Sequence, residues 1–184
     1  IAVDSVELLR QERYKDSMAA VNLLKREKAI ADLSKFRKKV DEFEGTTFYS
    51  DRRAPYYTNV NFIYPYIGKM DDQYWLRLRF QYAADDWLFI NRCQILVDGD
   101  KHVVTGEWNH DNNSKIWEWL DIKAGSSELL LLEQIANSKS AKVRYTGDQY
   151  YKDRTITNKE KSVIKKTLDI YNRLSNNMTY LIGD

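Results

Sequence analysis

The spacing of hydrophobic residues changes twice along the chain. Up to residue 44, apolar side chains recur every three or four residues, and this segment contains neither Gly nor Pro. Such spacing is typical of an amphipathic helix. Residues 1–44 are therefore predicted to form a helical arm of about 60 Å at 1.5 Å per residue, which ends in the sequence EGTT at Gly45.

A helix of this length is not stable alone and must bury its apolar stripe. Three arrangements satisfy this requirement: a helical hairpin, packing of the arm along the domain as a spacer, or pairing with another chain. We therefore expect residues 1–44 to serve as a spacer or as the element of a homo-oligomer, although the stripe lacks a sustained heptad.

The middle of the chain alternates apolar and polar residues, as half-buried strands do. Residues 73–82 alternate most clearly and place Trp75, Arg77 and Arg79 on one face. Further strands are predicted at residues 57–68, 86–97, 102–109 and 115–122. With an Asp-Gly turn between two of them, these strands are predicted to form an antiparallel meander.

The helical period returns in the C-terminal part. A helix is predicted over residues 124–138 and another over 157–174, where Thr157 and Glu160 have the spacing of a capping box. The chain is therefore predicted to be an α+β protein. Its domain, residues 45–184, has an antiparallel sheet meander packed by C-terminal helices and is preceded by the long N-terminal helical arm.

Trp117 and Trp119 lie two residues apart and so share one face of their predicted strand. If that face is open, they join Trp75, Arg77 and Arg79 in an aromatic and basic surface suited to flat or anionic ligands. We expect the other arrangement, in which helices cover the face, because three helices need apolar surface to pack against.

The composition excludes several kinds of site. The chain has 184 residues and one cysteine, Cys93, in an apolar run, so it has no intramolecular disulfide. His102, Glu107, His110 and Asp111 lack the helical or paired-cysteine frame of a zinc site, Asp98 and Asp100 lack the rest of a calcium loop, and no phosphate-binding loop is present. We therefore predict no metal and no cofactor.

Two further functions stay open as alternatives. Asp85, Asp86 and Asp111 lie near predicted turns and could serve a carboxylate-dependent hydrolase, although roles in turns and at a strand start account for Asp85 and Asp86 more simply. The basic residues Lys142 and Arg144, together with the arginines of the middle strand, could instead bind an anion or a nucleic acid. A pI of about 8.5 is low for a nucleic-acid-binding domain, which argues against the second ligand.

The runs DDWLFI…VDG, IWEW and LLEQIANSKSAKVRYTGDQYYKDRTITNKEKSVIKKTLDIY resemble a domain of uncharacterised bacterial exported or lipoprotein-type sequences. The resemblance covers roughly Gln73 to Leu174 and implies no activity, cofactor or functional residue. It implies an extracytoplasmic or envelope-associated location, with a cytoplasmic one as the alternative.

The chain opens at Ile1 rather than Met, which is consistent with a removed leader, a lipid-anchored segment or a cloning boundary, and no apolar run in it is long enough to span a bilayer. From the absence of catalytic motifs and the many aromatic residues, we predict a non-catalytic ligand- or protein-binding module of the bacterial cell envelope. The expected partner is a protein or a cell-envelope ligand.

Overall fold

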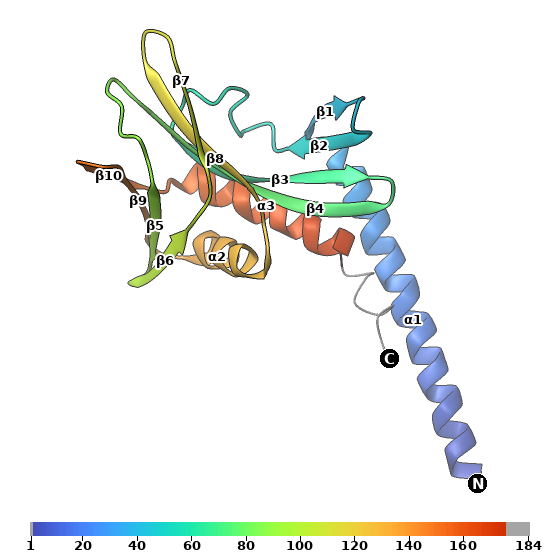
Figure 1. The fold of residues 1–184 in the computed structure, drawn as a ribbon. Helices are drawn as coiled ribbons and strands as arrows, with labels where there is room; N and C mark the ends of the chain where they lie inside the picture. The colour runs from blue at the N-terminus through green and yellow to red at the C-terminus, as the bar shows by residue number, and fades with distance from the viewer. Residues whose placement is uncertain (1, 176–184) are drawn as a thin grey trace.

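The computed structural model describes residues 2–175 and confirms the α+β class (Figure 1). Its elements are, in chain order, α1 (Ala2–Leu33), β1 (Arg37–Asp41), β2 (Thr46–Ser50), β3 (Phe62–Met70), β4 (Gln73–Ala84), β5 (Arg92–Val97), β6 (Asp100–Val104), β7 (Trp108–Asn112), β8 (Ile116–Lys123), α2 (Ser126–Asn137), β9 (Ala141–Thr146), β10 (Tyr151–Thr155) and α3 (Asn158–Ser175).

The strands divide between two antiparallel sheets. Sheet A has the order β1-β2-β3-β4-β8-β7, and sheet B has the order β10-β9-β5-β6. The chain thus leaves sheet A after β4, forms the β5–β6 hairpin in sheet B, and returns to sheet A with β7. Two predicted strands are corrected accordingly: residues 86–97 are extended in the sheet only from Arg92, and residues 102–109 are interrupted at Gly106, whose φ is 157°.

The predicted arm is too long. Helix α1 ends at Leu33, and Phe36 enters the core before β1 pairs with β2. The three-residue spacing of Val40 and Phe43 matches that of a helix, but both side chains are exposed on the β1–β2 hairpin. Gly45, with φ 63°, lies in the turn of that hairpin rather than at a helix end.

The helices pack on one face of sheet A. The main core joins this face, represented by Ile67, Leu78 and Phe80, with buried residues of α1, α2 and α3. Sheet B packs against the same face, since the Tyr145 ring lies 5.4 Å from that of Tyr82 and 5.7 Å from that of Trp108. The other face of sheet A, named here the outer face, is bordered by the β1–β2 hairpin and by residues 51–61 (Figure 1).

Helix α3 begins at the predicted capping box. The backbone N–H of Glu160 donates to Thr157 Oγ1 at 3.2 Å, and that of Thr157 donates to Glu160 Oε2 at 2.7 Å. The Glu160 carboxylate also accepts from Ile63 N at 2.7 Å and from Arg154 Nη2 at 2.7 Å. It therefore joins the helix start to the open edge of β3 and to sheet B.

A second buried carboxylate fixes the crossing from sheet A to sheet B. Glu118 on β8 is 1% exposed and accepts the backbone N–H groups of Leu88, Phe89 and Ile90 at 2.9, 2.9 and 2.6 Å. Phe89 has φ 53°, a value that non-glycine residues adopt at a cost. These hydrogen bonds offset that cost and turn the chain out of sheet A.

Asp51 attaches the loop beside the outer face to α3. Its side chain is 2% exposed and accepts from Arg53 N and Nε at 2.9 Å each, and Lys166 Nζ lies 3.7 Å away. Burial opposes the charged carboxylate, but the hydrogen bonds and charge of Arg53, with the charge of Lys166, outweigh it and lower the pKa of Asp51.

Replacing Glu118 with Gln should destabilise the fold. A carboxamide has one acceptor oxygen and turns an N–H₂ group toward the backbone donors, so at least one buried N–H loses its acceptor. We expect a loss of about 1–3 kcal/mol in the free energy of unfolding, measured by urea denaturation. The control is Glu133→Gln on the exposed side of α2. Equal stability of the two variants would contradict the role given to Glu118.

The low pKa of Asp51 predicts a pH-dependent contribution to stability. Because its folded pKa lies below the unfolded value, Asp51 stabilises the protein above about pH 4, and this contribution disappears as pH falls through the folded pKa. The difference in unfolding free energy between wild type and Asp51→Asn should therefore shrink on acidification. Denaturation at several pH values tests this, with the exposed Asp100→Asn as control. A difference that stays constant down to pH 2 would be contrary to this explanation.

Candidate functional site

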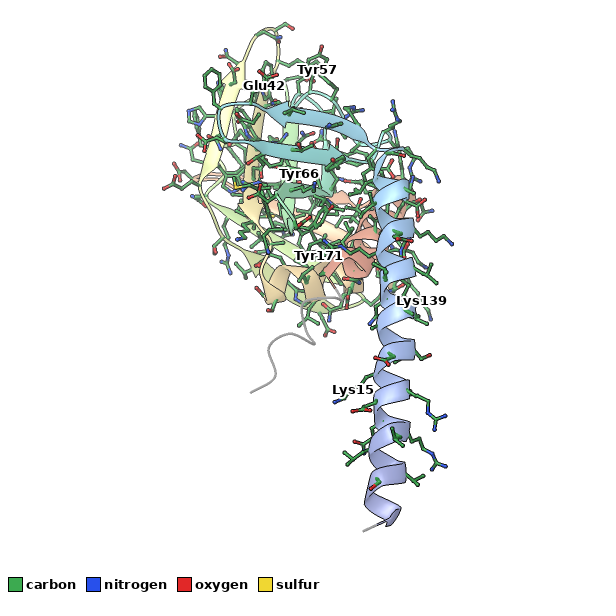
Figure 2. All side chains as sticks on the ribbon, turned by 90° about the vertical axis from the view of Figure 1, so that its right-hand side faces the viewer. Lys15, Glu42, Tyr57, Tyr66, Lys139 and Tyr171 are labelled. Atoms are coloured by element: carbon green, nitrogen blue, oxygen red, sulfur yellow. The ribbon has the colours of Figure 1, made fainter. Side chains whose placement is uncertain are left out.

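The outer face of sheet A gathers aromatic and charged side chains from four strands. Period-two alternation directs every second residue of each strand toward it. Its residues are Phe48 of β2, Tyr64 and Tyr66 of β3, Trp75, Arg77, Arg79 and Gln81 of β4, and Trp117, Trp119 and Asp121 of β8. Figure 2 shows Tyr66 on this face beneath β2.

Five of these residues form an arginine–tyrosine cluster, defined as Tyr64, Tyr66, Arg77, Arg79 and Asp121. Arg77 Nε donates to Asp121 Oδ1 at 2.8 Å, and its Nη2 donates to the Asp121 backbone oxygen at 3.2 Å. Arg79 donates to Asp121 Oδ2 through Nε, at 2.7 Å, and through Nη2. A single carboxylate therefore binds two guanidinium groups.

Tyr66 completes the cluster. Its hydroxyl lies 2.7 and 2.8 Å from the two Asp121 oxygens and accepts from Arg77 Nε at 2.8 Å. Burial, together with the negative charge of Asp121, raises the pKa of Tyr66. The hydroxyl is thus a hydrogen-bond donor to the carboxylate, and this environment does not make it a general base.

Arg79 is held on both sides. Its guanidinium carbon lies 5.3 Å from the centre of the Tyr66 ring, and Nη1 donates to the Tyr64 hydroxyl at 3.4 Å. Burial alone would lower the pKa of Arg79, but its interactions with Tyr64, Asp121 and Tyr66 are larger together and raise it. The positive charge of Arg79 is therefore permanent at any physiological pH.

The cluster is open to solvent in part. The side chains of Arg77 and Arg79 are 29% and 26% exposed, whereas that of Asp121 is 13% exposed. Within residues 2–175, Arg77 Nη1 donates no hydrogen bond. Two formal positive charges against one negative charge leave the cluster with a net charge of +1, and Arg77 has N–H groups to offer.

Trp75 borders the cluster by lying across Gly68. A methyl group at Gly68 would lie 2.2 Å from Trp75 Cε2, so glycine is required for this packing. The Phe48 ring meets Trp75 edge-on at 6.4 Å and Tyr66 at 5.8 Å. An aromatic border thus lines the β2 side of the cluster.

Gln81 is the one fully buried polar side chain on this face of β4. It is 0% exposed, and neither its amide nitrogen nor its amide oxygen has a hydrogen-bond partner among the described residues. In the strand register it lies between Phe62 and Trp119. Buried polar groups are normally paired, and an unpaired one costs about 1–3 kcal/mol.

The structure brings most of the predicted surface together. Trp75, Arg77 and Arg79 share the outer face with Trp117 and Trp119, and all five are half-buried. The expectation that helices cover this face holds only at its Tyr64 end, where Val163 of α3 packs against Phe62 and Tyr64. The larger set of buried helix residues packs on the opposite face and against sheet B. The buried residues of β8 are Ile116, Glu118 and Leu120, so the polar Glu118 lies on the core side between the two tryptophans.

Lys142 and Arg144 lie elsewhere, on β9 of sheet B. Arg144 binds Asp153 through Nε at 2.7 Å and Nη2 at 2.6 Å, and it lies 4.0 Å from the centre of the Tyr151 ring. Lys142 is exposed on the same strand. They therefore belong to a separate surface.

The carboxylates weighed for hydrolysis do not converge. Asp85 is 88% exposed, with Lys115 Nζ at 3.9 Å, and Asp86 and Asp111 are also exposed. His110 instead packs edge-on against Trp87 at 5.6 Å, and His102 lies on another sheet. The described residues contain no group of three or more side chains that could bind a metal ion.

Asp121, Tyr64 and Tyr66 were not predicted as site residues. A signal for them was present, since Asp121 continues the alternation of Trp117 and Trp119, and the two tyrosines alternate around Pro65. The pairing of these strands, which places Asp121 opposite Arg79 and Tyr64 opposite Arg79 on its other side, is visible only in the structure.

A groove of about 1320 Å³ lies apart from the outer face. Its walls are the N-terminal half of α1, the β3–β4 turn and the end of α3, with Gln11, Met18, Tyr74 and Tyr171 among its lining residues. No charged or polar groups of the arginine–tyrosine cluster reach it. Over the part of the chain that the structure describes, no helix has the length and apolar character needed to cross a membrane.

Gly68→Ala should move Trp75 away from β3. The added methyl group has no room against the indole, so we expect a loss of about 1–3 kcal/mol in unfolding free energy and a change in tryptophan fluorescence. Combining it with Trp75→Leu should recover part of the steric cost, giving a clear coupling energy. Strict additivity of the two substitutions would contradict this contact.

Comparison with protein-family models, with curated proteins and with solved structures finds no match to this chain. The geometry of the outer face is therefore the basis for inferring function, and the resemblance to exported bacterial domains stays a prediction.

Proposed function

We propose that the protein is a non-catalytic binding module of the bacterial cell envelope, and that the outer face of sheet A binds a small molecule bearing a carboxylate or phosphate group. The observation that carries this proposal is that Arg77 and Arg79, both partly exposed, share the single carboxylate of Asp121. The cluster therefore has an excess of positive charge beside unused N–H donors.

The arginines are already oriented before a ligand arrives. Asp121 binds both guanidinium groups, and Tyr66 and Tyr64 restrict them further. An incoming anion therefore loses less free energy to the ordering of long side chains than it would on freely rotating arginines. Guanidinium groups also match carboxylate and phosphate oxygens in geometry, which favours these anions.

The neighbouring residues favour a ligand with a polar ring over a bare ion. Aromatic side chains border the cluster through Phe48 and Trp75 on one side and Trp119 on the other. The unpaired carboxamide of Gln81 lies next to Arg79 along the same face of β4 and is fully buried, so a ligand group gains hydrogen bonds from it only if the side chains that cover it move aside.

The proposed location in the cell envelope is supported by the sequence resemblance and by the helical arm, which suits a spacer. Cell fractionation of the native gene product, followed by immunoblotting, tests this part separately. Recovery in the cytoplasmic fraction alone would remove the envelope from the proposal and would leave the anion site untouched.

The binding test compares two arginines of equal charge. Tryptophan fluorescence at low ionic strength is titrated with phosphate, citrate and glucuronate for the wild type, Arg77→Met and Arg92→Met. Arg92 is exposed on sheet B and is the matched control. We expect Arg77→Met to weaken binding roughly tenfold, the equivalent of one charged hydrogen bond, and Arg92→Met to change it less than about twofold.

Three results would contradict the anion site: no binding of any of the three probes, equal weakening by both substitutions, or full affinity in Arg77→Met. Gln81→Met adds a further readout. If Gln81 contacts the ligand, this variant binds more weakly although it unfolds at a higher denaturant concentration, since an unpaired buried amide has been removed.

A further inference from the structure

Helix α1 continues well beyond the domain that it packs against. It has 32 residues, about 48 Å at 1.5 Å per residue. Ala29 and Leu33 near its end are buried in the core, whereas residues 5–17 are exposed on the projecting part, as Figure 2 shows around Lys15. A projecting helix of this length is not stable through propensity alone.

The projecting part carries exposed apolar side chains on several faces, and one line of positions along it combines four apolar residues with two charged ones. Val6, Leu9 and Leu23 are 58%, 56% and 55% exposed. They fall in a series with alternating steps of three and four residues: Val6, Leu9, Arg13, Asp16, Ala20 and Leu23. This is the spacing of a two-helix seam, and we name these six residues the α1 seam.

The α1 seam faces away from the domain. At 100° per residue, it lies on the side of the helix opposite Met18, Asn22 and Arg26, which are the half-buried positions that lead down to the core. The groove beside α1 lies on that inner side, since Met18 and Asn22 line it. Leu23, at the border of the α1 seam, also lines the groove, so a partner on the seam covers one edge of the groove and leaves the core contacts of Ala29 and Leu33 unchanged.

The two charged residues of the α1 seam indicate how a second copy of the helix would be oriented on it. Arg13 donates from Nε to the Leu9 backbone oxygen at 3.3 Å, and among the described residues no ion pair involves Arg13 or Asp16. In a parallel pair of identical helices, Arg13 would face Arg13 and Asp16 would face Asp16. In an antiparallel pair, Arg13 of each copy faces Asp16 of the other copy, which gives two pairs of opposite charge.

The same antiparallel register matches the apolar positions. With Arg13 opposite Asp16, Leu9 lies opposite Ala20 and Val6 lies opposite Leu23, so every apolar residue of the α1 seam meets an apolar residue. We propose that the chain forms a two-fold symmetric homodimer through α1, with the two helices antiparallel in this register and the two domains at opposite ends. A single symmetric contact of this kind closes and does not continue into a filament.

Charge reversal tests the dimer without disturbing the fold, because both positions are exposed. Sedimentation of the full chain between about 5 and about 500 µM should detect a dimer in the wild type. Arg13→Asp should weaken the dimer at least about tenfold, since Asp would then face Asp16 twice. The double variant Arg13→Asp/Asp16→Arg should restore it. Lys25→Asp, exposed and off the seam, has the same charge change and serves as control.

Cysteine cross-linking tests the register. Oxidation of an equal mixture of Val6→Cys and Leu23→Cys chains should give a disulfide-linked dimer, and either chain alone should give far less; the native Cys93 is buried. Cross-linking of Val6→Cys chains with each other would indicate a parallel pair and overturn the proposal. A monomeric wild type throughout the concentration range would overturn it as well, as would an Arg13→Asp variant that dimerises with wild-type affinity.

Discussion

The carboxylate of Glu118 is the interaction on which the arrangement of the two sheets depends. Three consecutive backbone N–H groups, of Leu88, Phe89 and Ile90, donate hydrogen bonds to its two oxygens inside the protein. Buried backbone donors require acceptors, and an isolated crossing segment has no neighbouring strand to supply them. The Glu118 side chain of β8 therefore supplies this segment with the hydrogen-bond acceptors that a paired strand supplies elsewhere.

The position of this crossing determines which face of sheet A is left for a ligand. Because the chain turns toward the helical side after β4, sheet B and the helices share one face of sheet A. The outer face then receives the polar residues of the same strands, and Asp121 neutralises part of the charge of Arg77 and Arg79. Glu118 and Asp121, three residues apart on β8, thus serve opposite faces: the first closes the core and the second organises a partly exposed cluster.

The sequence could predict the elements far better than their assembly. Period-two alternation placed Trp75, Arg77 and Arg79 of β4 on one face and Trp117 and Trp119 of β8 on one face, and the Thr157–Glu160 spacing located the start of α3 correctly. The division into two sheets depends on pairings between strands distant in the chain, which local periodicity does not encode. In the sequence, Glu118 is only a polar residue between two tryptophans. Its role depends on the backbone of residues 88–90, which lies beside it only in the folded structure. Val40 and Phe43 misled because exposed apolar residues can imitate a helical stripe.

The most direct test of this account is native-state hydrogen exchange at Leu88, Phe89 and Ile90. If the Glu118 carboxylate binds these three amides throughout the folded state, they should exchange as slowly as the amides in the centre of β4, through global unfolding alone. Exchange of the three amides at the rate of an open loop, with β4 still protected, would show that the crossing is not fixed by Glu118. The arrangement of the two sheets would then require another explanation.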